Sequence, residues 1–186
     1  MEFGIRNSKI GREELIRRVK SVKLLLMDCD GVMTDARLWL TANGDEQKAF
    51  HARDGQGISV WHRAGWQSGI ISGRASSSVE RRAHELKIKY VHQYAKNKII
   101  ACEEIIADAQ VSADECCYIG DDLSDVALMR RVGFAVAVAD AAAETKTAAH
   151  YVTTLSGGQG AVREVIELIL KAQNRWDELV AQVTTA

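Results

Sequence analysis

The stretch MDCDGVMTD, from Met27 to Asp35, holds three carboxylates directly after a run of aliphatic residues. Carboxylates this close stay ionised together only when a cation offsets their repulsion; otherwise the pKa of one rises and that group takes up a proton. Because side chains two apart on an extended segment point to the same side, Asp28 and Asp30 can converge while Cys29 points elsewhere. The spacing therefore indicates a site for a cation or for proton transfer.

Polar residues also follow two later apolar runs of the chain. GIIS ends in Ser72, and CCYIG is followed by the acidic stretch DDLSD, which begins at Asp121. Ligands of open parallel sheets bind beyond the carboxyl ends of the strands, where these polar groups would meet. Two acidic boxes in matching contexts favour a functional site over a pair of helix caps or turns.

All candidate ligand atoms at this sheet edge are hard oxygens, which favours Mg²⁺ as the bound cation. Mg²⁺ keeps waters and often shares its coordination shell with a phosphate. The Ser72 hydroxyl, backbone N–H groups near Gly31 and Gly73, and a lysine would complete a cradle for a phosphoryl dianion. A carboxylate nucleophile that forms an aspartyl-phosphate would suit such a site.

Short apolar runs alternate with segments of helical composition along the chain. The expected strands are 22–27, 69–72, 89–92, 116–120, 134–139 and 151–153, and the expected helices are 11–21, 57–64, 77–86, 97–109, 124–131 and 161–173, with an alanine-rich helix between the last two strands. Two further strand-like segments flank Asn43-Gly44, the strongest short-range hairpin signal. This alternation predicts an α/β sandwich around a mainly parallel sheet.

Length and composition fit one globular domain that spans residues 1–186. Of the 186 residues 47% are hydrophobic, and the formal net charge of −1 gives no reason to expect a nucleic-acid partner. No apolar run approaches the roughly 20 residues that span a bilayer, so neither a membrane span nor a signal peptide is expected. The cysteines lack CxxC spacing, which favours free thiols in a reducing cytoplasm; they are Cys29, Cys102, Cys116 and Cys117.

The motifs together resemble those of the haloacid dehalogenase superfamily of phosphohydrolases. DCDGVMTD is similar to the DxDGx[TV] box of that family, IISG to its second motif, Lys98 to its third and YIGDDLSD to its GDDxxD fourth, in the family's order. FHARDGQGI, SGRASSSVERRAHEL, VAVADA and GGQGAVREV resemble a cap-less branch of the family, which contains the 3-deoxy-D-manno-octulosonate 8-phosphate phosphatases. This second resemblance covers nearly the whole chain after its first twenty residues.

The resemblance implies a Rossmann-like three-layer α/β/α sandwich with a mainly parallel central sheet. A small β-hairpin, at about residues 36–51, would be inserted instead of a cap domain, and a C-terminal helix and tail would occupy about residues 160–186. The hairpin carries more apolar surface than a lone ribbon can bury, on Leu38, Trp39, Leu40 and Phe50. Members of the cap-less branch assemble as rings of subunits. The resemblance therefore implies a homotetramer in which association completes the site.

The same resemblance implies a catalytic role for four residues. Asp28 would be the nucleophile, and Asp30 would be the general acid and later the general base. Ser72 and Lys98 would bind the phosphoryl oxygens and offset charge in the transition state. A positioned acid is needed because a sugar alkoxide is a poor leaving group.

Metal and substrate ligands are implied in the same way. Mg²⁺ would be held by Asp28, the backbone carbonyl of Asp30, and Asp121. Asp122 and Asp125 would not bind Mg²⁺ directly; they would contact and orient its ligands or Lys98. The candidates for the sugar-acid part of the substrate are His51, Arg53, Asp54, Gly55, Arg74 and Arg82.

The implied partner is a small-molecule sugar acid phosphate: 3-deoxy-D-manno-octulosonate 8-phosphate, with a nine-carbon ulosonic acid phosphate as the alternative. Ser59 stands where these phosphatases usually carry Arg or Lys after DGxGI, so a cation suited to a substrate carboxylate is missing. A non-enzymatic phospho-receiver module is the alternative of a different class. In a receiver the acceptor Asp stands alone at the middle strand, whereas here that strand ends in Ser72, and the order of motifs favours the phosphatase.

Overall fold

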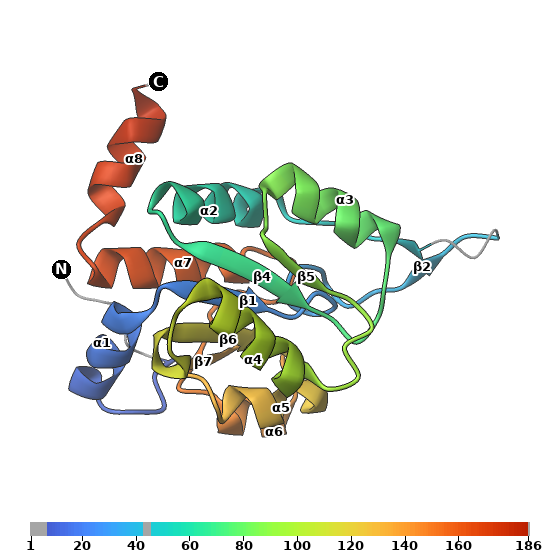
Figure 1. The fold of residues 1–186 in the computed structure, drawn as a ribbon, viewed down its shortest axis with the longest axis horizontal. Helices are drawn as coiled ribbons and strands as arrows, with labels where there is room; N and C mark the ends of the chain where they lie inside the picture. Colours follow the sequence, from blue (N-terminus) through green and yellow to red (C-terminus); the bar gives the residue numbers. More distant parts are fainter. Residues whose placement is uncertain (1–6, 43–45, 186) are drawn as a thin grey trace.

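The computed structural model describes residues 7–42 and 46–185, and its centre is a six-stranded sheet in which every neighbouring pair is parallel (Figure 1). The strand order is β5-β4-β1-β6-β7-β8. These strands are β1 (Leu24–Met27), β4 (Gln67–Ile71), β5 (Tyr90–His92), β6 (Cys116–Gly120), β7 (Phe134–Ala137) and β8 (Tyr151–Val152). The predicted mainly parallel sheet is confirmed.

Helices cover both faces of this sheet and complete the predicted three layers. On one face lie α2 (Ala52–Arg63), α3 (Ser77–Leu86) and α7 (Ala161–Ala172), and on the other lie α4 (Lys98–Ala109), α5 (Leu123–Met129) and α6 (Ala143–Ala148) (Figure 1). The helices α1 (Arg12–Ser21) and α8 (Trp176–Thr184) pack against α7, and the short 3₁₀ helix η2 (Ala113–Glu115) precedes β6. Among the described residues, no helix combines the length and the apolarity needed to cross a bilayer.

The central position of β1 explains where polar groups gather. All four residues of β1 are fully buried, as expected for a strand covered on both faces. Met27 pairs with Ile70 of β4 on one side and with Ile119 of β6 on the other. The residues that follow these three strands therefore meet at one edge of the sheet. The chain fills the β4 side of β1 first and the β6 side afterwards, and ligands of such folds bind at the point where the strand order reverses.

A small two-stranded sheet stands apart from the central one, between β1 and α2. Its antiparallel strands are β2 (Trp39–Leu40) and β3 (Glu46–Gln47), and the predicted turn at Asn43-Gly44 lies outside the described residues. Leu38, Trp39 and Leu40 are 46%, 59% and 69% exposed. Phe50, in contrast, packs partly buried against the core, so the apolar surface of the hairpin is smaller than the sequence suggested.

Two helices differ from the prediction. The helix α2 begins at Ala52, five residues before the predicted start at 57, because close packing overrides the low helix propensity of its glycines. A Cβ at Gly57 would press on the backbone of Arg163 in α7, so the glycine lets the two helices approach. The separate helix α8 was not predicted; it buries Leu179 against the body of the protein.

Candidate active site

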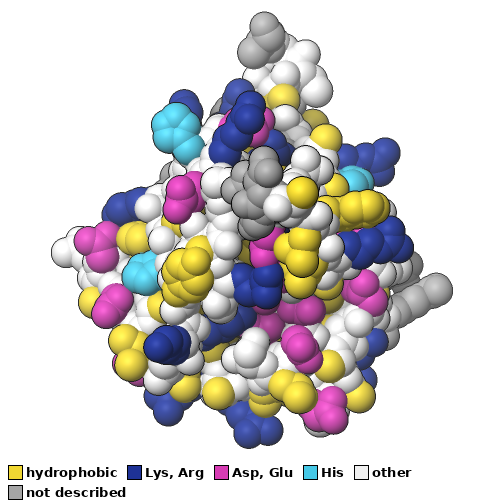
Figure 2. All heavy atoms as spheres, turned by 90° about the vertical axis from the view of Figure 1, so that its right-hand side faces the viewer, with side chains coloured by type: hydrophobic (Ala, Val, Ile, Leu, Met, Phe, Trp, Pro, Cys, Tyr) yellow, Lys and Arg dark blue, Asp and Glu magenta, His cyan; other side chains and the backbone are white. Residues whose placement is uncertain are grey.

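Three carboxylates and one lysine meet at the carboxyl edge of β1 and β6, and we call them the inner cluster. Asp28 directly follows β1, Asp121 directly follows β6, and Asp125 lies in α5; their carboxylate oxygens are within 4.8 Å of one another. Lys98, the first residue of α4, places its Nζ 3.0 Å from Asp28 Oδ1 and 2.7 Å from Asp125 Oδ1. Figure 2 shows acidic side chains gathered near the centre of this face, with basic and hydrophobic side chains around them.

Asp125 is held on all sides by hydrogen bonds. Its Oδ1 accepts from the Tyr118 hydroxyl at 2.7 Å as well as from Lys98. Its Oδ2 accepts from the backbone N–H groups of Asp121 and Asp122, at 2.9 and 3.2 Å. Since these contacts occupy Asp125, it orients Lys98 and the loop after β6, while Asp122 caps α5 through its bond to the backbone N–H of Leu123.

The inner cluster carries more negative than positive charge, and burial shifts the pKa values of its carboxyl groups. Burial raises the pKa of Asp28 to about 6 against the opposing pull of Lys98, and burial followed by repulsion from Asp28 and Asp125 raises the pKa of Asp121 to about 8. Burial alone would lower the pKa of Lys98, but the two carboxylates beside it outweigh that cost, so its pKa is raised and it stays charged. Three carboxylates against one ammonium leave two formal negative charges.

A divalent cation fits this charge deficit. Asp121 Oδ1 is buried and has no hydrogen-bond partner, which is costly unless a ligand completes it. The available donors are carboxylate oxygens, the ligands that Mg²⁺ prefers. Asp28 and Asp121 are the side chains suited to hold such an ion, because Asp125 is already occupied by the protein.

Two glycine-dependent contacts shape the loop beside the cluster. Gly31 has a φ of +100°, and a Cβ there would overlap the Asp121 carboxylate. Gly157 lies against the carbonyl of Gly31, where no side chain would fit, and the N–H of Gly158 donates to the carbonyl of Val32 at 3.0 Å. The loop 156–160 therefore forms a wall of the site.

Ser72 directly follows β4, the strand that pairs with β1. Its side chain is buried, and its Oγ accepts the backbone N–H of Arg74 at 3.2 Å. Ser72 and Lys98 thus bring a hydroxyl and an ammonium to the edge of the sheet where Asp28 lies, and groups of these kinds bind phosphoryl oxygens.

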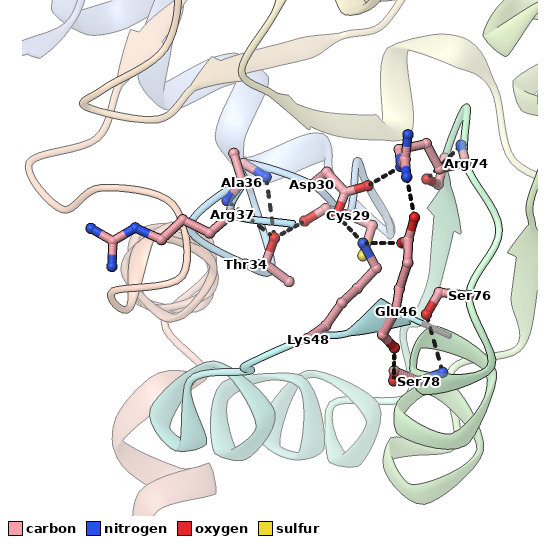
Figure 3. A network of polar contacts seen from close by, with 12 residues as sticks. Cys29, Asp30, Thr34, Ala36, Arg37, Glu46, Lys48, Arg74, Ser76 and Ser78 are labelled. Carbon is pink, nitrogen blue, oxygen red and sulfur yellow. Dashed lines mark hydrogen bonds and ion pairs between the residues drawn. The ribbon is translucent and has the colours of Figure 1, made fainter. Parts of the chain in front are cut away.

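Asp30 belongs to a second set of charges, which we call the outer ring. Lys48 pairs with Asp30 and lies 3.2 Å from Glu46, Glu46 pairs with Arg74, and Arg74 Nε lies 3.8 Å from Asp30 Oδ2 (Figure 3). Sequence reasoning missed Glu46 and Lys48. Their spacing held a signal, because residues two apart in a strand share a face.

Two of the predicted substrate residues, Asp54 and Gly55, have structural contacts. Asp54 is buried, and its Oδ1 accepts the backbone N–H of Arg163 at 2.8 Å, which fixes the start of α7. Gly55 makes room for Arg82, whose guanidinium a Cβ would overlap. Arg82 pairs with Glu85 at 2.9 Å and lines a cleft of about 400 Å³ that Lys48 also lines.

The other predicted substrate residues fall into two places. Arg74 reaches the outer ring, and its side chain is half-exposed. His51 and Arg53 lie at the start of α2, where Arg53 lines a cavity of about 490 Å³ together with Gln159. His51 lies beside Gly160, with its Nδ1 buried and without a hydrogen-bond partner. The loop 156–160 thus connects this second place to Gly31 and the inner cluster.

Known proteins are similar to this chain in sequence and in fold. The 3-deoxy-D-manno-octulosonate 8-phosphate phosphatase of Yersinia pestis is 42% identical over 163 residues, which are 88% of this chain and 87% of its own. This chain is a haloacid dehalogenase-like hydrolase. The model of that family matches residues 91–166.

Two solved structures of relatives extend the comparison. The phosphatase of the same name from Moraxella catarrhalis, in complex with magnesium, phosphate and a KDO molecule, aligns with a TM-score of 0.90 at 39% identity, covering 93% of this chain and 99% of its own. The cobalt-bound form of the Haemophilus influenzae enzyme aligns with a TM-score of 0.82 at 39% identity, covering 84% and 92%.

Proposed function

We propose that this protein is a Mg²⁺-dependent phosphatase that converts 3-deoxy-D-manno-octulosonate 8-phosphate to the free sugar acid and phosphate. The observation that carries the proposal is the inner cluster, in which a buried Asp28 paired with Lys98 lies beside Asp121 and its unpartnered oxygen. The names of the relatives support the eight-carbon substrate over the nine-carbon alternative.

In the first step, an oxygen of Asp28 attacks the phosphorus and forms an aspartyl-phosphate while the bond from phosphorus to the sugar oxygen breaks. Asp30 gives its proton to the departing sugar oxygen. Lys98 and Ser72 bind the phosphoryl oxygens and stabilise the charge that develops on them. Asp28, the backbone carbonyl of Asp30, and Asp121 would hold Mg²⁺, which would supply the positive charge that offsets repulsion between the carboxylate and the phosphoryl group.

The second step returns the enzyme to its starting state. Asp30, now ionised, accepts a proton from a water molecule as that water attacks the phosphorus. The bond between Asp28 and phosphorus breaks, and inorganic phosphate leaves. One carboxyl group thus serves as acid and then as base, so its placement matters twice in each turnover.

Recognition of the sugar acid is assigned to basic groups outside the inner cluster. Arg74 Nε lies 3.8 Å from Asp30 Oδ2, and Arg53 and His51 lie beside the loop 156–160. A guanidinium can bind a carboxylate through two parallel hydrogen bonds, and Arg74 is exposed enough to do so. These cations compensate for Ser59, which lies in α2 where a basic residue is usual.

We further propose that the chain forms one phosphatase domain that assembles as a homotetramer in the cytoplasm. The exposed Leu38, Trp39 and Leu40 give the hairpin an apolar surface that a second copy would cover. All four cysteines are buried free thiols, in keeping with a reducing compartment. Sedimentation at micromolar protein tests the assembly, and a stable, fully active monomer would contradict it.

Phosphate release from a panel of sugar phosphates, with Mg²⁺ or with EDTA, tests the activity. The expected result is Mg²⁺-dependent turnover with the highest kcat/KM on 3-deoxy-D-manno-octulosonate 8-phosphate. A higher kcat/KM on the nine-carbon acid would correct the substrate, and a preference for a neutral hexose phosphate would overturn both assignments.

A further inference from the structure

We propose that Lys48 is a positioning residue that holds the Asp30 carboxyl in place for proton transfer. This inference rests on the proposed function, since it assumes that Asp30 is the general acid and base. It gives the hairpin a part in the reaction beyond covering the site.

Lys48 is buried in a way that a surface lysine is not. Only 2% of its side chain is exposed, although it belongs to a small ribbon outside the central sheet. Burying an ammonium is costly unless charged partners surround it, and here Asp30 and Glu46 do so. Lys48, which follows β3 of the hairpin, thus places a buried ammonium beside the Asp30 carboxyl (Figure 3).

Asp30 has little else to fix its side chain. Its Oδ1 is held by Lys48, whereas its Oδ2 is buried without a hydrogen bond and has Arg74 Nε at 3.8 Å. Asp30 also follows the end of β1, in a turn where no neighbouring strand constrains it. Proton transfer needs the acid within about 3 Å of the leaving oxygen, and a misplacement of about 1 Å can cost about 100-fold in rate.

Glu46 fixes Lys48 in turn and joins it to the predicted substrate residues. One carboxylate oxygen of Glu46 lies 3.2 Å from Lys48, and the other pairs with Arg74. The backbone carbonyl of Glu46 accepts the Ser78 hydroxyl at 3.0 Å, which ties β3 to α3. The position of Asp30 therefore depends on how the hairpin is docked against the rest of the protein.

The test compares kcat of Lys48→Met with kcat of the wild type on two substrates that differ in leaving group. A sugar alkoxide must be protonated as it leaves, whereas 4-nitrophenolate leaves without a proton. We expect kcat to fall about 100-fold on the sugar acid phosphate and less than about 10-fold on 4-nitrophenyl phosphate. Lys48→Arg should restore part of the loss, and Arg37→Met serves as the matched control, because Arg37 is a mostly exposed cation paired only with Asp35 among the described residues.

Asp30→Asn and the double variant separate this inference from the proposed function. If Lys48 acts through Asp30, Asp30→Asn shows the same dependence on leaving group, and adding Lys48→Met costs little more. An equal loss on both substrates for Lys48→Met, or a further full loss in the Asp30→Asn background, would overturn the inference alone. An equal loss on both substrates for Asp30→Asn would overturn the general-acid role and the inference with it. Lys48→Gln replaces Lys48→Met if thermal melting shows that the methionine variant does not fold.

Discussion

The inner cluster and the outer ring share one device, a buried lysine between two carboxylates. Lys98 lies between Asp28 and Asp125, and Lys48 lies between Asp30 and Glu46. Their charge balance differs. The inner cluster has an additional carboxylate and two formal negative charges, whereas in the outer ring two carboxyl groups face two cations, Lys48 and Arg74.

This difference indicates what each region is built to receive. An uncompensated acidic centre gains stability from a cation, and the cation then attracts a phosphate. The outer ring already has a cation beside each carboxyl group, so its contacts serve to fix the geometry of Asp30 and Arg74. We thus assign the reaction at phosphorus to the inner cluster and the contacts with the sugar to the outer ring.

The largest expected effect is on the inner cluster. Asp28→Asn should lower kcat by about 1,000-fold or more on sugar and aryl phosphates alike, because it removes the nucleophile of the first step. Mass spectrometry must show that the asparagine has not deamidated back to aspartate. Turnover near that of the wild type would remove Asp28 from the mechanism.

The next effect concerns the cation. Asp121→Asn should weaken Mg²⁺ binding by at least about 10- to 100-fold. A loss of this size is typical even when the replaced residue only hydrogen-bonds to a metal ligand. Activity at low Mg²⁺ should fall accordingly and recover in part as Mg²⁺ is raised. Asp122→Asn is the matched control, since Asp122 caps α5 and points to its own helix. Equal Mg²⁺ dependence of the two variants would contradict the assignment of Asp121.

A smaller effect is expected on the outer ring. Arg74→Met should raise KM for the sugar acid phosphate by about 10-fold or more, because it removes a charged hydrogen-bonding partner for the acid group. For a phosphate without a carboxylate KM should change little. Arg74→Lys keeps the charge but not the planar fork and should restore only part of the affinity. A loss confined to kcat would assign Arg74 to the chemistry instead of to binding.

The sequence predicted the inner cluster because its signals are local. Each acidic box directly follows an apolar strand, and in a parallel sheet the ends of neighbouring strands meet, so Asp28 and Asp121 come together without further information. Lys98, in contrast, was identified by its resemblance to the third motif of the family, and the structure places it at the start of α4, which packs beside β1. The mainly parallel sheet follows from the same alternation of strands and helices.

The outer ring could not be predicted in this way. Glu46 and Lys48 reach Asp30 only because the hairpin folds back over the sheet edge, and its docking depends on contacts with α3 such as the one from Ser78. The glycines of α2 lower its helix propensity, so its start at Ala52 was not predicted. For the same reason the sequence did not show that Asp54 lies in this helix and accepts a hydrogen bond from the backbone of Arg163. Both failures concern tertiary packing, which overrides local propensity.

The smallest effect distinguishes the two regions by stability. In the native state the pKa of Asp121 is raised to about 8 and that of Asp28 to about 6, so between about pH 4 and pH 8 the metal-free native protein binds more protons than the unfolded chain does. By linkage, the contribution of these groups to the free energy of unfolding falls as pH rises through that window. Urea unfolding in EDTA at pH 5 and pH 8 measures this contribution as the difference between wild type and Asp121→Asn.

We expect Asp121→Asn to stabilise the metal-free protein at pH 8 and to matter much less at pH 5, where the wild-type carboxyl is protonated. Added Mg²⁺ should reverse the order at pH 8, because only the wild type gains the full binding free energy of the ion. Lys48→Met should destabilise at both pH values, since it leaves Asp30 and Glu46 without their shared cation. If the stabilities of the two variants depend on pH in the same way, the inner cluster does not have the excess of negative charge that distinguishes it from the outer ring.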